Sequence, residues 1–473
     1  MHPVDFLILL IFLLINVAVG FRIKRKVKDI EDYALGGRNF TTGILTATIV
    51  ATWLGGNVIT STISKVYNEG IIAMLIMAYN ITVPLITALV YIPRMKEFLG
   101  KISMGEVMGD LHGTPARIIT GVAGIIIGIG IIAIQFKVSA TIFSYFFGIP
   151  EIWALLISSS IVVAYSTFGG VRAVTFTDVV QFYTFGTFIP ILAFRIWIKI
   201  GDNNIIYTTL ATTPKFHISQ LFDISNPEIS SKLILILFVS LIPMIGPVLF
   251  QRIAMAKDIK QAKESFLLSA LFAGMITVLL CWIAILLYSS NPNIDTSKIL
   301  MYIADEYTYI GLKGLIVIGV LALTMSTADS NINASCVLVY DDIFKPLGIC
   351  KNIDSLLLVK IASLIIGIFG IFMAFSSDNL MKIVFSVLAY YLPIVNVPFI
   401  LAIFGFRSKG APVYIGMAAG LITVLYCQIT KCTKLELFIP GMIANFVFFL
   451  GSHYLMRAEG GWGKETSIAT KTS

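Results

Sequence analysis

The sequence predicts an all-α integral membrane protein with many transmembrane helices. Of its 473 residues, 57% are hydrophobic and only 13% are charged, and the mean hydropathy is +0.91. Soluble domains carry about 25% charged residues, so this chain lies outside their range. A hydrocarbon core of roughly 30 Å is crossed by about 20 apolar residues in a helix. Helices are the expected spanning structure because lipid offers no water to the backbone.

Thirteen hydrophobic segments are long enough to be predicted as membrane spans. They occupy residues 4–20, 44–64, 71–92, 117–147, 151–168, 176–198, 232–250, 265–288, 312–340, 356–375, 382–404, 412–429 and 436–456. We expect residues 1–458 to form a single transmembrane domain, because no extramembrane segment is long enough for a separate folded domain. The polar residues 459–473 are predicted to be a short disordered tail.

The basic residues predict the orientation in the membrane. The formal net charge is +8, and the lysines and arginines gather in alternate loops, as is typical of cytoplasmic segments. These segments are 21–43, 93–116, 251–264, 405–411 and the tail from Arg457. The N-terminus is therefore predicted outside the cell and the C-terminus in the cytoplasm. Because the charge follows topology and forms no single patch, the predicted partner is the lipid bilayer and not a nucleic acid.

The chain carries none of the common catalytic signatures. It has no phosphate-binding glycine loop, no GxSxG elbow and no HExxH run. Its cysteines and histidines do not follow metal-ligand spacing. An enzyme is therefore not expected, and the chemistry is predicted to lie among polar residues inside the bilayer, where such residues are costly and usually functional.

Two predicted helices contain breaks at matching places. Gly55, Gly56 and Asn57 interrupt the first, and Pro243 with Gly246–Pro247 interrupts the second. Each broken helix begins a block of five spans, 44–198 and 232–404, which predicts two inverted repeats with a substrate site between the breaks. The alternative is ordinary glycine and proline kinks. The residues predicted to bind substrate at these breaks are Gly55, Gly56, Asn57, Val239 and Pro243.

The stretch TMSTADSNIN, residues 324–333, places polar groups near the middle of another predicted span. On a helix, Leu323, Ser326 and Thr327 share one face. The two hydroxyls could bond back to carbonyls of their own helix. They could instead bind a small hard cation, which prefers oxygen ligands.

Four stretches resemble the sodium/solute symporter family. They are YALGGRNF (33–40), YSTFGGVRAVTFTDVVQ (165–181), FQRIAMAKDIKQAKES (250–265) and LALTMSTADSNINASCVLVYDDIFKP (321–346). The order and spacing of these motifs, and the thirteen spans, also match the family. The resemblance implies a LeuT-like fold: two inverted five-helix repeats preceded by one helix and followed by two.

The resemblance also implies that Na⁺ is the coupling ion and that its site lies between the first helix of repeat one and the LTMST segment. The ligands implied are the carbonyls of Ala47, Val50 and Leu323 and the hydroxyls of Ser326 and Thr327. Asp329 and Asn333 would then order the inner exit path.

Asp178, in the TD motif, is predicted at the cytoplasmic mouth of its helix. Two roles stay open for it. It could cap the helix, since an aspartate near a helix N-terminus is favoured by the dipole. It could also draw released Na⁺ along the exit path.

The sequence departs from the family at three positions. Several sodium-coupled members have an aspartate where this chain has Ile49, so one charge near the ion site is missing. Proline-binding members present aromatic residues where this chain has Val239 and Pro243, so proline is not the expected substrate. A sugar is not expected either, because few Gln, Asn and Glu residues face the predicted centre.

Lys137 lies deep in its predicted span, where a lysine costs on the order of 3 kcal/mol unless it is paired or hydrated. Snorkelling to the surface is one explanation. We hypothesise instead that Lys137, with Gln135 or Ser139, pairs with an anionic group of the substrate or replaces a coupling cation.

The function predicted from these features is sodium-coupled symport of a small organic solute, an amino acid or organic acid, into the cell by alternating access. Two alternatives stay open. Ile49 and Lys137 would suit a proton-driven or uncoupled carrier. A transporter-like sensor acting with a separate signalling partner is the other.

Overall fold

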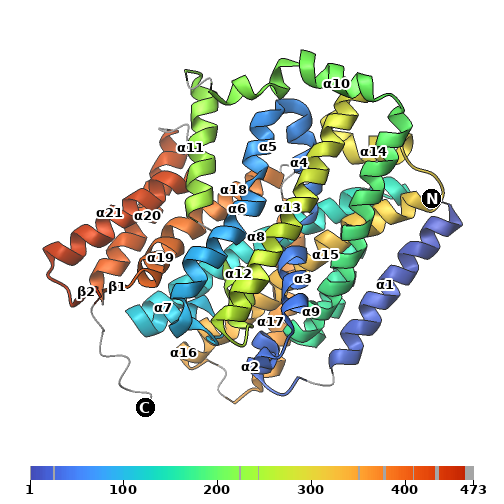
Figure 1. Cartoon of the computed structure of the whole chain (residues 1–473). Coiled ribbons are helices and arrows are strands. Elements are labelled where there is room, and N and C mark those ends of the chain that lie inside the picture. Colours follow the sequence, from blue (N-terminus) through green and yellow to red (C-terminus); the bar gives the residue numbers. More distant parts are fainter. Residues whose placement is uncertain are drawn as a thin grey trace.

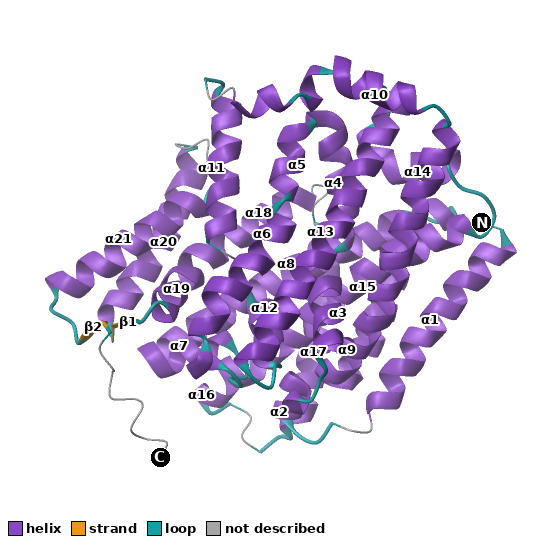
Figure 2. Ribbon diagram, in the orientation of Figure 1, coloured by secondary structure: helices purple, strands orange, loops and turns teal. Residues whose placement is uncertain are grey.

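The computed structural model describes residues 2–24, 27–222, 225–242, 244–349, 352–376, 380–408, 410–431 and 436–463. Figure 2 shows that the described chain is almost entirely helical. The two short strands β1 (Phe406–Ser408) and β2 (Gly460–Trp462) pair antiparallel at one end of the bundle. The fold is therefore a single bundle of membrane helices with no large sheet in the described residues.

The first broken helix consists of α3 (Thr42–Trp53) and α4 (Gly56–Glu69), which are bent by 58° relative to each other. Before it lie α1 (Pro3–Lys24) and the short α2 (Ile30–Leu35). The break needs a glycine, because a Cβ on Gly56 would lie 2.1 Å from the Thr324 methyl carbon. The predicted interruption at Gly55–Gly56 is confirmed.

Five further α-helices complete the first block. They are α5 (Ile71–Met77), α6 (Tyr79–Ile86), α7 (Met104–His112), α8 (Thr114–Phe147) and α9 (Glu151–Ile200). Of these, α5, α8 and α9 pack against α3 or α4. Helix α9 is kinked at Gly170, whose φ of 58° is one that glycine adopts easily. A Cβ at Gly170 would also approach the Tyr33 ring carbon to 2.9 Å. The predicted spans 151–168 and 176–198 are the two arms of α9.

The second block begins after α10 (Asn203–Thr212), which lies across one end of the bundle in Figure 1. Its helices are α11 (Pro227–Leu241), α12 (Pro247–Ala254), α13 (Ile259–Ser290), α14 (Ile299–Glu306), α15 (Leu312–Leu338), α16 (Lys345–Leu347), α17 (Ser355–Phe375), α18 (Leu380–Tyr391) and α19 (Val397–Ile403). Helix α11 ends at Leu241 and α12 starts at Pro247, which fits the first position of a helix. The second predicted break is therefore present.

The last helices, α20 (Ala411–Thr430) and α21 (Phe438–Leu455), pack against each other at one edge of the bundle. Figure 1 places α1 at the opposite edge. Ten of the described helices are long and apolar enough to cross a membrane, or eleven if the bent pair counts as one span. The predicted spans 151–168 and 232–250 correspond to shorter apolar helices, Glu151–Thr167 and Ile229–Leu241. The predicted count of thirteen therefore stays a prediction.

Helix α15 is the centre of the bundle. In its apolar window 94% of the residues are buried, against 28% to 72% in the other unbroken spans. It packs against α8, α9, α1, α17 and α3. The polar stretch 324–333 is therefore surrounded by protein and not by lipid, which places it where a functional site can form.

Candidate functional site

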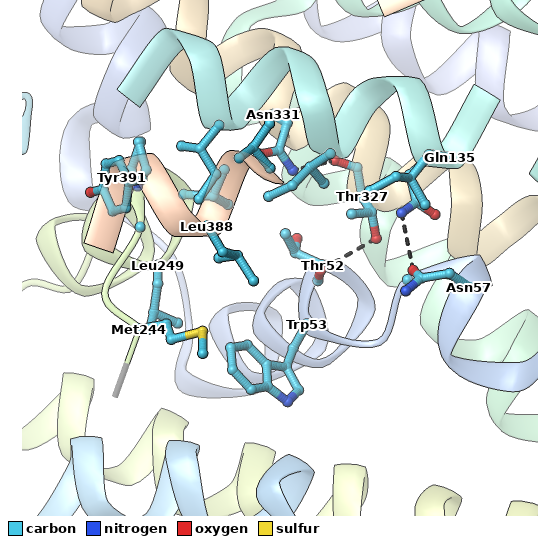
Figure 3. Close-up of a pocket in the computed structure, with 18 of the residues that line it drawn as sticks. Thr52, Trp53, Asn57, Gln135, Met244, Leu249, Thr327, Asn331, Leu388 and Tyr391 are labelled. Atoms are coloured by element: carbon cyan, nitrogen blue, oxygen red, sulfur yellow. Dashed lines mark hydrogen bonds between the residues drawn. The ribbon is translucent and has the colours of Figure 1, made fainter. Parts of the chain in front are cut away.

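A cavity of about 260 Å³ lies between the two helix breaks. Figure 3 shows Asn57 and Gln135 at one end, Tyr391 at the other, and Thr52 and Thr327 between them. Side chains from both blocks form the wall. Residues that line it include Thr52, Trp53, Gly55, Asn57, Tyr79, Gln135, Arg252, Thr327, Asn331 and Tyr391.

Gln135 stabilises the break between α3 and α4. Its Oε1 accepts a hydrogen bond from the Gly56 backbone N–H at 3.0 Å, and its Nε2 donates to Asn57 Oδ1 at 3.2 Å. The first N–H groups of a helix have no partner within it, so an acceptor from a neighbouring helix is favourable. Gly55, Asn57 and Gln135, which the sequence predicts to bind substrate, line the cavity. Gly56, predicted with them, lies between Gly55 and Asn57 in the chain.

Polar side chains form part of the largely apolar wall. Three amide side chains contribute to it, those of Asn57, Gln135 and Asn331, together with the hydroxyls of Thr52 and Thr327. The sequence already predicts Asn57 and Gln135 at this site, and Asn331 on α15 adds a third amide. The shortage of amides on which the argument against a sugar rests is therefore smaller than the sequence indicated.

Aromatic rings cover another part of the wall. The rings of Trp53 and Tyr79 lie edge to face, with centroids 6.2 Å apart. The hydroxyl of Tyr391 donates to the Ile245 carbonyl at 3.1 Å and so fixes the chain between α11 and α12. Flat rings beside amides are typical of sites for small organic ligands.

Three residues predicted to bind substrate are not placed in this wall. Lys137 Nζ lies 3.1 Å from Glu151 Oε1, and Lys137 and Val239 are absent from the residues that line the cavity. Pro243 lies outside the described residues. Ser139, named as a companion of Lys137, donates instead to Thr324 Oγ1 at 2.8 Å. The ion pair with Glu151 gives Lys137 a structural reason to lie in the span.

The five residues implied as sodium ligands belong to α3 and α15, which pack against each other. Ala47, Val50, Leu323, Ser326 and Thr327 are all buried. Thr327 Oγ1 donates to the Thr52 carbonyl at 3.3 Å, and Ser326 Oγ donates to Asp178 Oδ1 at 2.5 Å. Both hydroxyls bond to another helix. The oxygen donors gathered here are of the type that a hard cation prefers.

Asp178 is fully buried inside α9. Its carboxylate accepts hydrogen bonds from the Thr48 and Ser326 hydroxyls and from Arg252 Nη2, the last at 3.3 Å. The prediction of a position at the helix mouth was wrong, because the second arm of α9 begins at the Gly170 kink and Asp178 lies eight residues further along it. Asp178 caps no helix; it joins α9 to α3, α12 and α15.

Asp329 and Asn333 follow on α15, and both are buried. Asp329 Oδ2 accepts from the Tyr165 hydroxyl at 2.8 Å, while its Oδ1 has no partner among the described residues. Asn333 Oδ1 accepts from Gln251 Nε2 at 3.0 Å. A buried polar chain thus continues from Ser326 along α15.

Arg252 is the residue that sequence reasoning missed. It is 2% exposed, lines the cavity and forms an ion pair with Asp178. The sequence places it in the basic segment 251–264, which is predicted to be cytoplasmic. The available signal was its place only five residues after Pro247, inside the apolar run PVLFQRIAM.

The segment that contains α2 and Arg38 packs against the end of the bundle where α16 lies in Figure 1. Asp32 Oδ1 accepts from Arg172 Nε at 2.8 Å, and the Ala34 carbonyl accepts from Gln251 Nε2 at 2.8 Å. Arg38 donates to the Ala256 carbonyl at 2.7 Å. These bonds hold α2 against α9 and α12.

Two known proteins with similar sequences are named sodium symporters. The Sodium/sialic acid symporter NanT of Aliivibrio fischeri is 22% identical over 456 residues, which cover 91% of this chain and 88% of the relative. The Sodium/sialic acid symporter SiaT of Proteus mirabilis is 22% identical over 463 residues, covering 93% and 92%.

Solved structures give the same fold. The substrate-bound, outward-open structure of a Na⁺-coupled sialic acid symporter matches with a TM-score of 0.85 at 21% identity, covering 96% of this chain and 98% of the other. The structure of Mhp1, a nucleobase-cation-symport-1 family transporter, matches with a TM-score of 0.54 at 13% identity, covering 89% and 93%. The predicted fold class, an all-α inverted-repeat membrane protein, is confirmed.

A family model described as the Sodium:solute symporter family matches residues 33–420, most of the chain. This range contains both helix breaks, the cavity and the Ser326–Thr327 pair. The chain therefore belongs to the sodium:solute symporter family, a multi-pass membrane transporter and not an enzyme, with sodium as its coupling ion and a small organic solute as its cargo.

Proposed function

We propose that this protein carries an organic acid into the cell together with Na⁺. The observation that carries the proposal is the position of Thr327. Its hydroxyl is one of the implied sodium ligands, and the same residue lines the cavity and bonds to the Thr52 carbonyl of the first broken helix. The sodium site and the solute cavity would therefore share Thr327.

Sodium would be held by the carbonyls of Ala47, Val50 and Leu323 and by the hydroxyls of Ser326 and Thr327. These ligands belong to α3 in one block and α15 in the other, so bound sodium would join the two blocks. A ligand that binds one conformation better shifts the population toward it. Solute and sodium would then favour each other's binding by the same factor, and the inward sodium gradient would set the direction.

The cavity supports a polar acid of moderate size as the cargo. Amide and hydroxyl groups could bond to hydroxyls of a solute, Trp53 and Tyr79 could pack on its apolar face, and Arg252 supplies a positive charge. Two relatives are named sialic acid symporters, and sialic acid is a carboxylate with several hydroxyls. N-Acetylneuraminate is therefore the first solute to test.

The orientation and domain organisation complete the proposal. We place the N-terminus outside and the C-terminus in the cytoplasm, with repeats at about 44–198 and 232–404 within a single domain, 1–458. In this orientation α2 lies on the cytoplasmic side, and Asp178 and Asp329 lie along the route by which Na⁺ would leave.

Uptake into proteoliposomes tests the function. Radiolabelled N-acetylneuraminate should accumulate above equilibrium when sodium is high outside and choline is high inside, and an inward proton gradient alone should not drive it. Uptake driven by protons without sodium would support the proton-driven alternative. Equilibration without accumulation would support an uncoupled carrier, and solute binding without any flux would support a sensor.

A further inference from the structure

Arg252 is a buried cation positioned between the cavity and the implied sodium site. Its Nη2 donates to Ser330 Oγ at 2.5 Å, to Asp178 Oδ2 at 3.3 Å and to Thr52 Oγ1 at 3.4 Å. Ser330 and Thr52 belong to α15 and α3, the two helices that hold the implied ligands. Nη2 of Arg252 therefore contacts both α3 and α15, the helices that carry the implied sodium ligands.

The rest of the guanidinium is poorly bonded. Nη1 has only long contacts, 3.5 Å to Gln251 Oε1 and 3.4 Å to Met255 Sδ, and Nε has no partner among the described residues. An arginine has five N–H donors, and buried donors normally find acceptors. Arg252 also lines the cavity, so an acceptor there would complete its bonding.

Asp178 links this arginine to sodium. The same carboxylate accepts from Arg252 and from Ser326, whose hydroxyl is an implied sodium ligand. A sodium ion bound to the Ser326 hydroxyl would be separated from the Asp178 carboxylate only by that hydroxyl. It would also lie near the positive charge of Arg252. In a buried site such charges are weakly screened, so the guanidinium and sodium would compete for one anion.

We propose that Arg252 is a tethered cation that competes with Na⁺ for Asp178 and that a carboxylate of the solute draws it away. With the cavity empty, the guanidinium neutralises Asp178 and weakens sodium binding. An anionic solute in the cavity offers acceptors to the poorly bonded Nη1 and Nε of Arg252, so the charge of Asp178 becomes available to sodium. The proposal rests on the proposed function and deepens it, because it names the residue that couples the two cargoes and the charge that the solute carries.

A solute-free sodium titration tests the first half. The melting temperature of the purified full chain in detergent would be measured against NaCl, with choline chloride holding the ionic strength constant. A cation that binds the folded state raises this temperature. In Arg252→Gln we expect a lower temperature without sodium, since Asp178 loses its partner, but a half-stabilising sodium concentration at least tenfold below that of the parent.

Three further variants separate competition from simple damage. Arg252→Lys keeps a cation and should remain within about threefold of the parent. Ser330→Ala removes the 2.5 Å anchor of the guanidinium and should also lower the half-stabilising concentration, even if Arg252→Gln does not fold. Arg172→Gln, which breaks the distant pair with Asp32, should leave the half-stabilising sodium concentration unchanged. An unchanged or higher sodium requirement in both Arg252→Gln and Ser330→Ala would overturn the proposal.

The second half is tested by repeating the titration with N-acetylneuraminate and with its uncharged methyl ester. In the parent, the acid should lower the half-stabilising sodium concentration and the ester should not; in Arg252→Gln neither should lower it further. Equal effects of acid and ester, including no effect of either, would overturn the role of the carboxylate. A parent protein that shows no sodium effect would refute the proposed function itself, whereas a parent effect without the Arg252→Gln shift would refute only the role of Arg252.

Discussion

The Glu69 carboxylate and the Lys232 ammonium lie 2.8 Å apart and join the end of α4 to the beginning of α11. Helices α4 and α11 are each one half of a broken helix. The ion pair therefore connects the first block to the second. Tyr67, near the same end of α4, makes a further contact with the second block: its hydroxyl donates to the Asn291 carbonyl at 2.6 Å. We infer that α4 and α11 move together when that side opens.

Breaking this pair should affect transport more than stability. A partly exposed ion pair contributes roughly 0 to 1 kcal/mol, so Glu69→Gln should change the melting temperature little and the solute concentration for half-maximal uptake by about two- to fivefold. The reversed pair Glu69→Lys with Lys232→Glu should recover most of the loss. If the reversed pair is no better than the single variant, the two helices do not depend on this contact.

Loss of the hydroxyl pair should weaken sodium binding. Ser326→Ala and Thr327→Ala each remove one implied oxygen ligand, and we expect the sodium concentration for half-maximal uptake to rise at least tenfold with little change in expression. Ser335→Ala is a matched control on the same helix, since its buried hydroxyl has no partner among the described residues. Equal sodium dependence in parent and variants would refute the ligand assignment.

Adding one methyl group at the first break should distort the cavity. In Gly56→Ala the new Cβ would lie 2.1 Å from Thr324 Cγ2, and such overpacking typically costs about 1 to 3 kcal/mol. The melting temperature should fall, and Thr324→Ser, which removes that methyl group, should restore part of it. Gly43→Ala serves as a control, because nothing lies within 4 Å of its new Cβ. An additive double variant would show that this contact is not the cause.

Acid should destabilise the protein through His112, which lies at the end of α7, outside the spans. Burial lowers its pKa from 6.5 to about 4, so between these values the unfolded chain binds the proton more readily than the folded one. The stabilising contribution is complete above pH 6.5 and is lost as the pH falls to about 4, with a magnitude on the order of 3 kcal/mol.

Melting temperatures between pH 7 and pH 4 check this expectation. His112→Asn should flatten part of the fall, whereas the parent and the surface variant His217→Gln should follow the same curve. Because the ring nitrogen Nδ1 of His112 lies 2.7 Å from the Ser408 carbonyl, the variant should be less stable than the parent at neutral pH. A variant as acid-sensitive as the parent would assign the fall to other groups.

Much of the fold could be predicted because its signals are local. Gly55 and Gly56 interrupt an apolar helix, and the structure bends there by 58°. Ser326 and Thr327 could be singled out because they lie in a stretch that resembles a family motif, and the structure shows both bonded to other helices. Such features need only the residues within one helix to be recognised.

The positions of charged residues could not be predicted, because burial depends on which helices meet. Asp178 and Arg252 are 74 residues apart in sequence, and each alone resembles a residue at the cytoplasmic boundary. Lys137 appeared to be unpaired in its span because its partner, Glu151, lies at the start of the next helix. The buried Asp178–Arg252 pair costs far less to bury than either charge alone, and only the tertiary structure reveals either pairing.

The burial of α15 has a consequence for how the protein is made. Its apolar window has a mean hydropathy of only 1.6, against 2.4 for that of α8, and an aspartate at a helix centre strongly disfavours entry into lipid. Four of the five packing partners named for α15, namely α1, α3, α8 and α9, precede it in the chain and can receive it as it leaves the ribosome. Insertion of α15 during synthesis should therefore depend on these earlier helices, and a chain lacking them should leave this segment outside the membrane.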